Sequence, residues 1–336
     1  MVTIISGIAL LLITLAAFSL FSLKMPKGQA AMSGMANAAV ATFLVEAIMS
    51  YIAGDLFGIS FFKDVGSIAG GMGGVAAAAL VPMGMGASPV LSMCAGVAVG
   101  GYGILPGFIA GYVVGLIGPA IEKKLPEGLD VIVGALAVAS VARAIAAFVN
   151  PGVTMVLSII GKTITEATLT SPIIMGFLLG GIIKMICTSP LSSMALTAML
   201  GLTGLPMGIA AVACFGGSFT NGTIFKRLHF GNNGNVIAVM LEPLTQADIV
   251  TTHPIPIYGS NFFGGGIAGV GAAMLGIVNN APGTASPIPG MLAPFAFNAP
   301  GKVVMALAIA AVGGGIAGFI GSIVFKKFDE GAEAVD

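Results

Sequence analysis

The chain has 336 residues and no net formal charge; 57% of its residues are hydrophobic and only 8% are charged. Its mean hydropathy is +1.06. So few polar groups cannot coat a soluble particle of this length, which excludes a soluble globular protein. We therefore predict an all-α protein that crosses the lipid bilayer several times. The basic groupings are all short, which argues against a nucleic-acid partner.

The first predicted element is an apolar segment over residues 2–23. It has about the length needed to cross a hydrocarbon core of roughly 30 Å. Lys24 and Lys27 follow it, and no charge precedes it. A cleavable signal peptide carries its positive charges in front, so we expect residues 1–27 to be a retained transmembrane helix with a basic stop and an outside N-terminus.

A Ser-Pro motif recurs three times, at residues 88–93, 189–194 and 286–291. A Gly/Ala-rich apolar stretch and a basic cluster follow each copy; the clusters lie at 121–125, 224–228 and 324–328. This pattern predicts three in-phase repeats of about 100 residues. We place them at 28–128, 129–230 and 231–330, with a polar tail at 331–336.

The basic cluster that ends each repeat predicts the membrane topology. The positive-inside rule puts all three clusters in the cytoplasm, so each repeat must cross an even number of times. If all the apolar segments of one repeat crossed the membrane, the number of crossings in that repeat would be odd. We therefore expect re-entrant or broken segments at the Ser-Pro loops, lining a pathway, and about eight to ten crossings in total.

Alignment of the repeats on the Ser-Pro motif places polar residues at two matching points. The first point holds Glu46, Arg143 and Glu242, and the second holds Asp55, Asn150 and His253. A charge at the centre of a spanning helix costs about 2.5–3.5 kcal/mol, so such residues usually have a partner or a function. Two hypotheses remain for Arg143: it binds substrate, or it only neutralises Glu46 or Glu242.

Glu242 is the strongest candidate for substrate binding. Pro243 interrupts the helix beside it, and Thr245, Gln246 and Asp248 add hydrogen-bonding groups. His253 follows between further prolines and could handle a proton, since the unperturbed pKa of histidine is near 6.5. It could equally be a hydrogen-bonded structural histidine.

Other polar segments allow two interpretations each. Glu166 could bind substrate, or it could be an acidic residue in the first turn of a helix behind a threonine cap. The amides in 219–222 and 279–284 would suit a polyhydroxylated ligand, although both segments are also typical of turns.

No motif indicates a cofactor or a metal. Cys94, Cys187 and Cys214 have no metal-ligand spacing and lie in apolar surroundings, so we expect buried thiols. The chain has no GxxxxGK[ST] phosphate loop and no GxSxG elbow, which argues against ATP-driven transport and against an intramembrane hydrolase.

Ile164-Thr165-Glu166, Leu241-Glu242-Pro243, His253 and the Gly-rich layout together resemble the membrane-embedded IIC components of the bacterial phosphotransferase system, in the perfringolysin regulator-like branch. The glutamate motif of the sugar-transporting members is split here between 164–166 and 241–243. The resemblance implies a homodimeric permease in the bacterial cytoplasmic membrane. It also implies a sugar or polyol substrate held by Glu242 or Glu166, with His253 assisting, and separate IIA and IIB proteins, the latter as phosphodonor.

Two other functions remain open. In a proton-coupled secondary transporter, Arg143 would bind a small anion and Glu242 or His253 would carry the proton. Alternatively, a ligand-sensing membrane regulator would bind the ligand without moving it.

Overall fold

The computed structural model describes residues 2–124, 126, 128–129, 132, 134–189 and 192–331. Helices are the only regular secondary structure among these residues, which confirms the all-α prediction. The first part contains α1 (Val2–Lys24), α2 (Gly28–Ala39), the π-helical segments η1 (Val40–Leu44) and η2 (Ala47–Leu56), α3 (Ser60–Gly71), α4 (Gly73–Gly84), α5 (Pro89–Ala98) and α6 (Ile104–Lys124).

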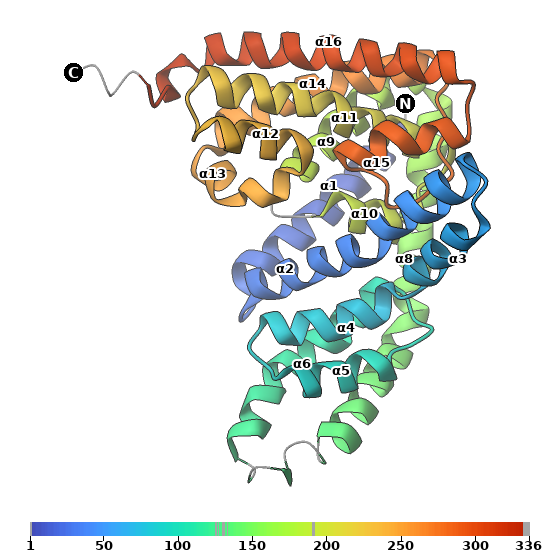
Figure 1. The fold of residues 1–336 in the computed structure, drawn as a ribbon, viewed down its shortest axis with the longest axis vertical. Coiled ribbons are helices and arrows are strands. Elements are labelled where there is room, and N and C mark those ends of the chain that lie inside the picture. The colour runs from blue at the N-terminus through green and yellow to red at the C-terminus, as the bar shows by residue number, and fades with distance from the viewer. Residues whose placement is uncertain are drawn as a thin grey trace. The chain divides into compact units, whose positions relative to one another are not determined.

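The described residues from Gly134 onward begin with a π-helical segment and contain α8, the longest of the described helices (Figure 1). Its elements are η3 (Gly134–Val138), α8 (Ala139–Thr170), α9 (Pro172–Thr188), α10 (Ser193–Met199), α11 (Gly204–Arg227), α12 (Asn233–Leu241), η4 (Pro243–Gln246), α13 (Ala247–Thr252), α14 (Pro254–Met274), α15 (Pro287–Leu292), η5 (Ala293–Ala296), α16 (Pro300–Val324) and η6 (Lys326–Phe328).

Six helices in the described residues are long and apolar enough to cross a membrane. They are Ile5–Lys24, Gly28–Asp55, Ile104–Lys124, Leu136–Thr170, Gly204–Arg227 and Pro300–Val324. The number is seven if α3 and α4, bent by 55° at their junction, count as one broken span. This is fewer than the eight to ten expected; the apolar stretches at 89–98 and 172–188 form helices of 10 and 17 residues, shorter than these six.

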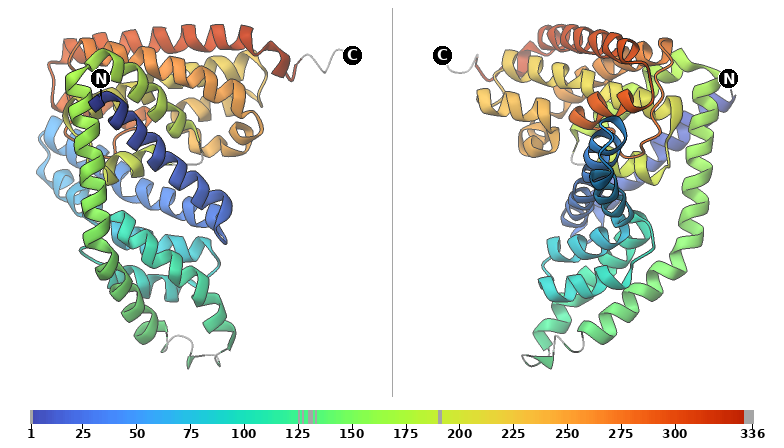
Figure 2. Two further views of the ribbon diagram at one scale, coloured as in Figure 1. Left: turned by 180° about the vertical axis from the view of Figure 1, so that it is seen from behind. Right: turned by 45° about the vertical axis from the view of Figure 1, so that its right-hand side comes forward.

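One of two compact units contains Leu12–Ile160 and Ala198–Gly201. Within it α4 packs against α2, α5 and α6; in Figure 2 α2 is blue and α4, α5 and α6 are teal. A Cβ at Gly107 would overlap the backbone of Gly74, so α6 and α4 approach each other closely. Ala78, Val99 and Val114 belong to the core that these helices bury.

The other unit contains Met1–Leu11, Gly161–Thr197 and Leu202–Asp336. Here α14 packs against α9, α11 and α16. A Cβ at Gly269 on α14 would overlap the carbonyl oxygen of Gly176 on α9. Small residues at such crossings let helix backbones meet, which is how helices associate in a solvent that gives them no hydrophobic driving force.

The Ser-Pro motif begins a short helix and a longer one follows. Ser88 and Ser286 are the N-cap residues of α5 and α15, with proline in the first turn, where its missing N–H costs nothing. In the middle copy α10 begins at Ser193. These helices have 10, 6 and 7 residues, too few to cross, as expected for re-entrant or broken segments. The threefold division itself stays a prediction, since the packing forms two units.

Candidate functional site

Glu242 lies where the helix breaks, as its sequence predicts. It is the C-cap of α12 and has an extended backbone (φ −148°, ψ 95°), which a residue before proline favours. The next turn, η4, starts at Pro243. The Glu242 side chain is half-buried and its Oε2 accepts a hydrogen bond of 3.2 Å from the Ser286 hydroxyl. The break thus leaves a carboxylate facing the interior of the unit.

Two Ser-Pro segments meet beside this carboxylate. Ser286 belongs to the third copy and is 2% exposed. Ser193, from the second copy, donates a hydrogen bond of 2.6 Å to the carbonyl oxygen of Ala285. In the first copy, the Ser88 backbone N–H donates to the Glu122 carboxylate, and both residues belong to the other unit. The second and third copies therefore contribute to the surroundings of Glu242.

Lys184 is a site residue that the sequence analysis missed. It lies on α9 and is fully buried, and its Nζ has no hydrogen-bond partner. Its aliphatic stem passes over Gly217 of α11 and Gly265 of α14, where a Cβ would overlap it. A lone lysine in the apolar stretch 172–188 was the available signal, since a charged residue in an apolar segment of a membrane protein usually has a function. The repeat alignment did not indicate Lys184, because no charged residue occupies the matching position in the other two repeats.

Lys184 and Glu242 belong to one electrostatic cluster. The Lys184 charge acts on Glu242 and on the thiols of Cys187 and Cys214. Burial raises the pKa of the Glu242 carboxyl above its ordinary value, while the Ser286 hydroxyl, the Leu244 N–H and the Lys184 charge act against that rise. The ion pairs of the described residues do not include Lys184 with Glu242.

The cysteines of this cluster come from neighbouring helices. Cys187 on α9 and Cys214 on α11 are buried and their thiols interact with each other. The prediction of buried thiols is thus confirmed for these two, whereas Cys94 is only partly buried. Among the described residues, no group of three or more His, Cys, Asp or Glu side chains has the arrangement of a metal site.

A row of buried polar side chains joins the same three helices. Asn261 on α14 donates to Asn221 on α11 (2.6 Å), and Asn221 donates to Thr188 on α9 (3.4 Å). The Asn261 Oδ1 has no partner. The segment 219–222 lies within α11 and is helical, so the turn expected there is wrong. The segment 279–284 does form a turn, in which Asn279 binds Thr284.

Thr245 and Gln246 stabilise the loop after Glu242. The Thr245 hydroxyl donates to the Glu242 carbonyl oxygen (2.8 Å). Gln246 accepts from Asn235 (2.7 Å) and donates to the Thr245 carbonyl oxygen (2.9 Å). Their side chains thus hold the backbone that presents the carboxylate.

His253 has a different set of partners from those expected. Its ring stacks on Phe230 with centroids 4.1 Å apart, and its Nε2 lies 3.2 Å from the Glu330 carboxylate. Hydrogen bonds and ion pairs in the described chain do not join it to Glu242. These contacts favour the structural interpretation of His253, at the start of α14.

Arg143 is held by backbone carbonyl groups. Its Nη1 donates to the carbonyl oxygens of Ala98 (3.2 Å) and Gly100 (2.6 Å), and the guanidinium lies 4.4 Å from the centre of the Tyr102 ring. The expected ion pair with Glu46 or Glu242 is not among those of the described residues. Arg143 instead satisfies the carbonyls at the end of α5, where a helix dipole favours a cation.

The remaining candidates lie elsewhere and have local partners. Glu46 accepts a hydrogen bond of 3.5 Å from Tyr51, and Asn150 accepts one of 3.4 Å from Thr154. Asp55 forms an ion pair of 2.7 Å with Lys63. Glu166 is exposed in the last turns of α8, so its interpretation as an acidic residue in a first helical turn is wrong.

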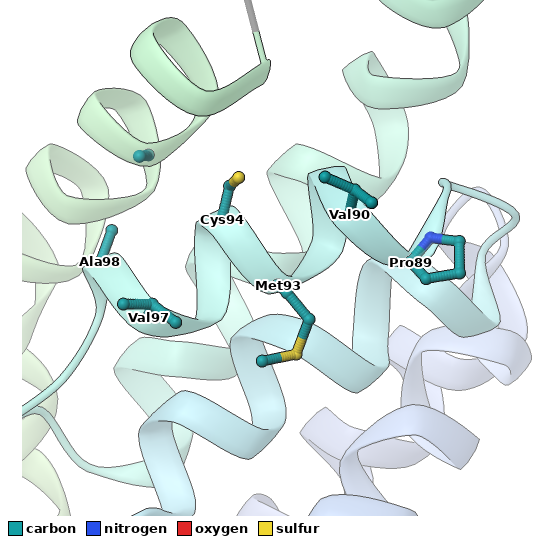
Figure 3. Close-up of a pocket in the computed structure, with 7 residues that line it drawn as sticks. Pro89, Val90, Met93, Cys94, Val97 and Ala98 are labelled. Carbon is teal, nitrogen blue, oxygen red and sulfur yellow. The ribbon is translucent and has the colours of Figure 1, made fainter. Parts of the chain in front are cut away.

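An open groove along α5 offers only apolar side chains (Figure 3). Its lining consists of Pro89, Val90, Met93, Cys94, Val97, Ala98 and Ala139. A sugar needs hydrogen-bonding partners that this lining lacks, so the groove is a poor site for a polar solute.

Comparison with known proteins decides the family. The family model described as "Phosphotransferase system, EIIC" matches residues 29–334. The chain belongs to this family. This EIIC protein is thus a multi-pass membrane protein and a permease subunit of the phosphotransferase system, with a sugar-type substrate and IIA and IIB components as partners. No curated protein and no solved structure matches it.

Proposed function

We propose that this EIIC protein binds a small sugar or polyol at Glu242 and presents it for phosphorylation by a separate IIB protein. The observation that carries this proposal is a half-buried carboxylate at a helix break, held by Ser286 and interacting electrostatically with the buried Lys184. Transporters often form their substrate-binding sites at such broken helices. We further propose that the protein acts as a homodimer in the bacterial cytoplasmic membrane and belongs to the perfringolysin regulator-like branch.

The proposed role of the chain is to bind and orient. An ionised carboxylate accepts hydrogen bonds from sugar hydroxyls, and a hydroxyl held in this way can be aimed at the phosphoryl donor. Glu166 is the weaker candidate, because its side chain is exposed on α8. The chemistry of phosphoryl transfer would be supplied by the IIB protein.

The test is a thermal-shift screen of the detergent-purified protein against sugars and polyols, followed by the variant Glu242→Gln. A ligand at 100 times its Kd stabilises the native state by about 2.7 kcal/mol. We expect one sugar to stabilise the wild type. Loss of a hydrogen bond to the charged carboxylate should weaken its binding about 10- to 100-fold in E242Q. Lys326→Ala, in the exposed basic cluster, should bind normally.

Uptake into vesicles separates this function from the alternatives. We expect uptake to require IIA, IIB and a phosphodonor. Proton-dependent uptake without a phosphodonor would support a secondary transporter. Binding without uptake under either condition would support a membrane regulator. Wild-type affinity in E242Q would remove Glu242 from the site.

A further inference from the structure

Lys184 carries an inference that rests on the proposed function and extends it to the nature of the substrate. An ammonium group buried without a hydrogen-bond partner is energetically costly, and an apolar side chain of the same length would fill the space without that cost. The three donors of the Lys184 Nζ have no acceptor in the structure. A ligand that supplies an acceptor would compensate for this cost.

The helices around Lys184 make room for its side chain. Gly217 and Gly265 lie against the stem from two different helices, and a Cβ at either position would overlap it. The stem therefore lies in a slot with a glycine on each of these helices, which holds the side chain in place. Such a slot positions the nitrogen, as a binding residue requires.

The charges around the slot indicate a neutral ligand. Glu242 is the carboxylate whose charge interacts with Lys184, but the two do not form one of the ion pairs of the described chain. Together they are neutral when both are ionised. Lysine only donates hydrogen bonds and a carboxylate only accepts them, whereas a hydroxyl group does both. A polyhydroxyl compound is therefore the ligand class that satisfies both side chains.

We propose that Lys184 is a substrate-binding residue that donates a hydrogen bond to a hydroxyl oxygen of a neutral sugar or polyol, while Glu242 accepts one from the same or an adjacent hydroxyl. Lys184 then selects for that hydroxyl. An analogue without it leaves the ammonium unpaired and binds more weakly.

The experiment compares Lys184→Met with the wild type, using the sugar that stabilises the wild type most. Methionine keeps the length and apolar character of the stem but removes the charge. We expect the ligand-free K184M protein to melt at the wild-type temperature or above it, because a buried unpaired charge is gone. We expect its affinity for the sugar to fall at least about 10-fold. The matched control is Lys302→Met at an exposed lysine of α16, which should change neither quantity.

Deoxy analogues of the same sugar provide the second measurement. One monodeoxy analogue should bind the wild type about 10- to 100-fold more weakly than the parent sugar, and this difference between analogue and parent should be smaller for K184M. If K184M does not purify as a folded protein, Lys184→Leu also removes the donors, fills the slot with an apolar side chain and allows the same comparison.

The outcomes separate the two proposals. If no sugar or polyol stabilises the wild type, the proposed function fails and the role of Lys184 fails with it. If the sugar binds the wild type and K184M equally, only the role of Lys184 is wrong. A lower melting temperature of K184M with unchanged affinity would make Lys184 a structural residue. Preference for a carboxylated sugar over its neutral parent would overturn the charge argument.

Discussion

Individual charged residues in this chain have similar apolar sequence neighbours but different structural roles. Glu242 and Lys184 belong to one buried cluster. Arg143 binds the carbonyl groups of Ala98 and Gly100 and is exposed. The cost of placing a charge in an apolar medium predicts that each has a partner, but it does not distinguish a carbonyl group, a carboxylate or a ligand. Only the contacts separate binding residues from structural ones.

The pH dependence of Glu242 is the first prediction. Because burial raises its pKa, the folded protein binds a proton on this group at pH values where the unfolded chain has lost it. Unfolding then releases the proton, so the stability of the ligand-free protein should fall as pH rises from the ordinary glutamate pKa through the raised one. Melting temperatures between about pH 4 and 8 measure this, and E242Q should lack that slope.

Ligand binding at Glu242 should depend on pH in the opposite sense. The ionised carboxylate accepts the sugar hydroxyl, so affinity should decrease as pH falls through the raised pKa. Lys184, Cys187 and Cys214 belong to the same electrostatic cluster as Glu242. An affinity that is constant across the range would contradict the assignment of the carboxylate.

Arg143 supports the second prediction. Arg143→Met removes two hydrogen bonds to carbonyl groups and the contact with the Tyr102 ring. We expect the free energy of unfolding to fall by about 1–2 kcal/mol, with unchanged sugar affinity. Denaturant titration and thermal-shift binding assays measure the two effects, and Arg143→Lys should lose less stability. Loss of binding at unchanged stability would instead favour an anion transporter that uses Arg143.

At the scale of elements, close helix packing depends on glycine at particular crossings. The α9 and α14 helices meet at Gly176, Gly180, Gly265 and Gly269, and the same pair carries Lys184 and Asn261. The packing that stabilises the unit therefore also positions the polar groups of the site. Many other glycines have no such role; a Cβ at Gly315 on α16 would meet no atom within 4 Å.

Gly269→Leu tests this crossing. The new side chain would overlap the backbone of Gly176, and the helices would have to separate. We expect the free energy of unfolding to fall by about 1–3 kcal/mol or more. We also expect weaker sugar binding, because the same helices position the polar groups of the site. Gly315→Leu, the same change at an open position, should be close to neutral. Equal stability of the two variants would show that the crossing tolerates a larger separation.

At the scale of the whole molecule, the basic residues near the ends of α6, α11 and α16 predict the topology. Lys123 and Lys124 end α6, Lys226 and Arg227 end α11, and Lys326 begins η6 after α16. All three ends should face the cytoplasm, where the IIB protein acts.

Cysteine labelling tests the topology. In a Cys94→Ser background, Lys124→Cys, Lys226→Cys and Lys327→Cys should react with a membrane-impermeant maleimide in inverted vesicles but not in intact cells. Cys187 and Cys214 are buried and should stay unlabelled in the folded protein. Labelling of any one of the three ends from outside would rule out the in-phase arrangement of the repeats.

The sequence by itself determined that this protein lies in the lipid bilayer, that its fold is all-α and that a helix ends at Glu242. Composition fixes the first two, because a backbone in lipid must satisfy its own hydrogen bonds. Proline fixes the third, because it removes a backbone donor. Tertiary structure alone decided that Ser286, Lys184 and Glu242 come together while His253 and Arg143 bind elsewhere. Side chains distant in the sequence meet only through helix packing, and that packing depends on which glycines face another helix.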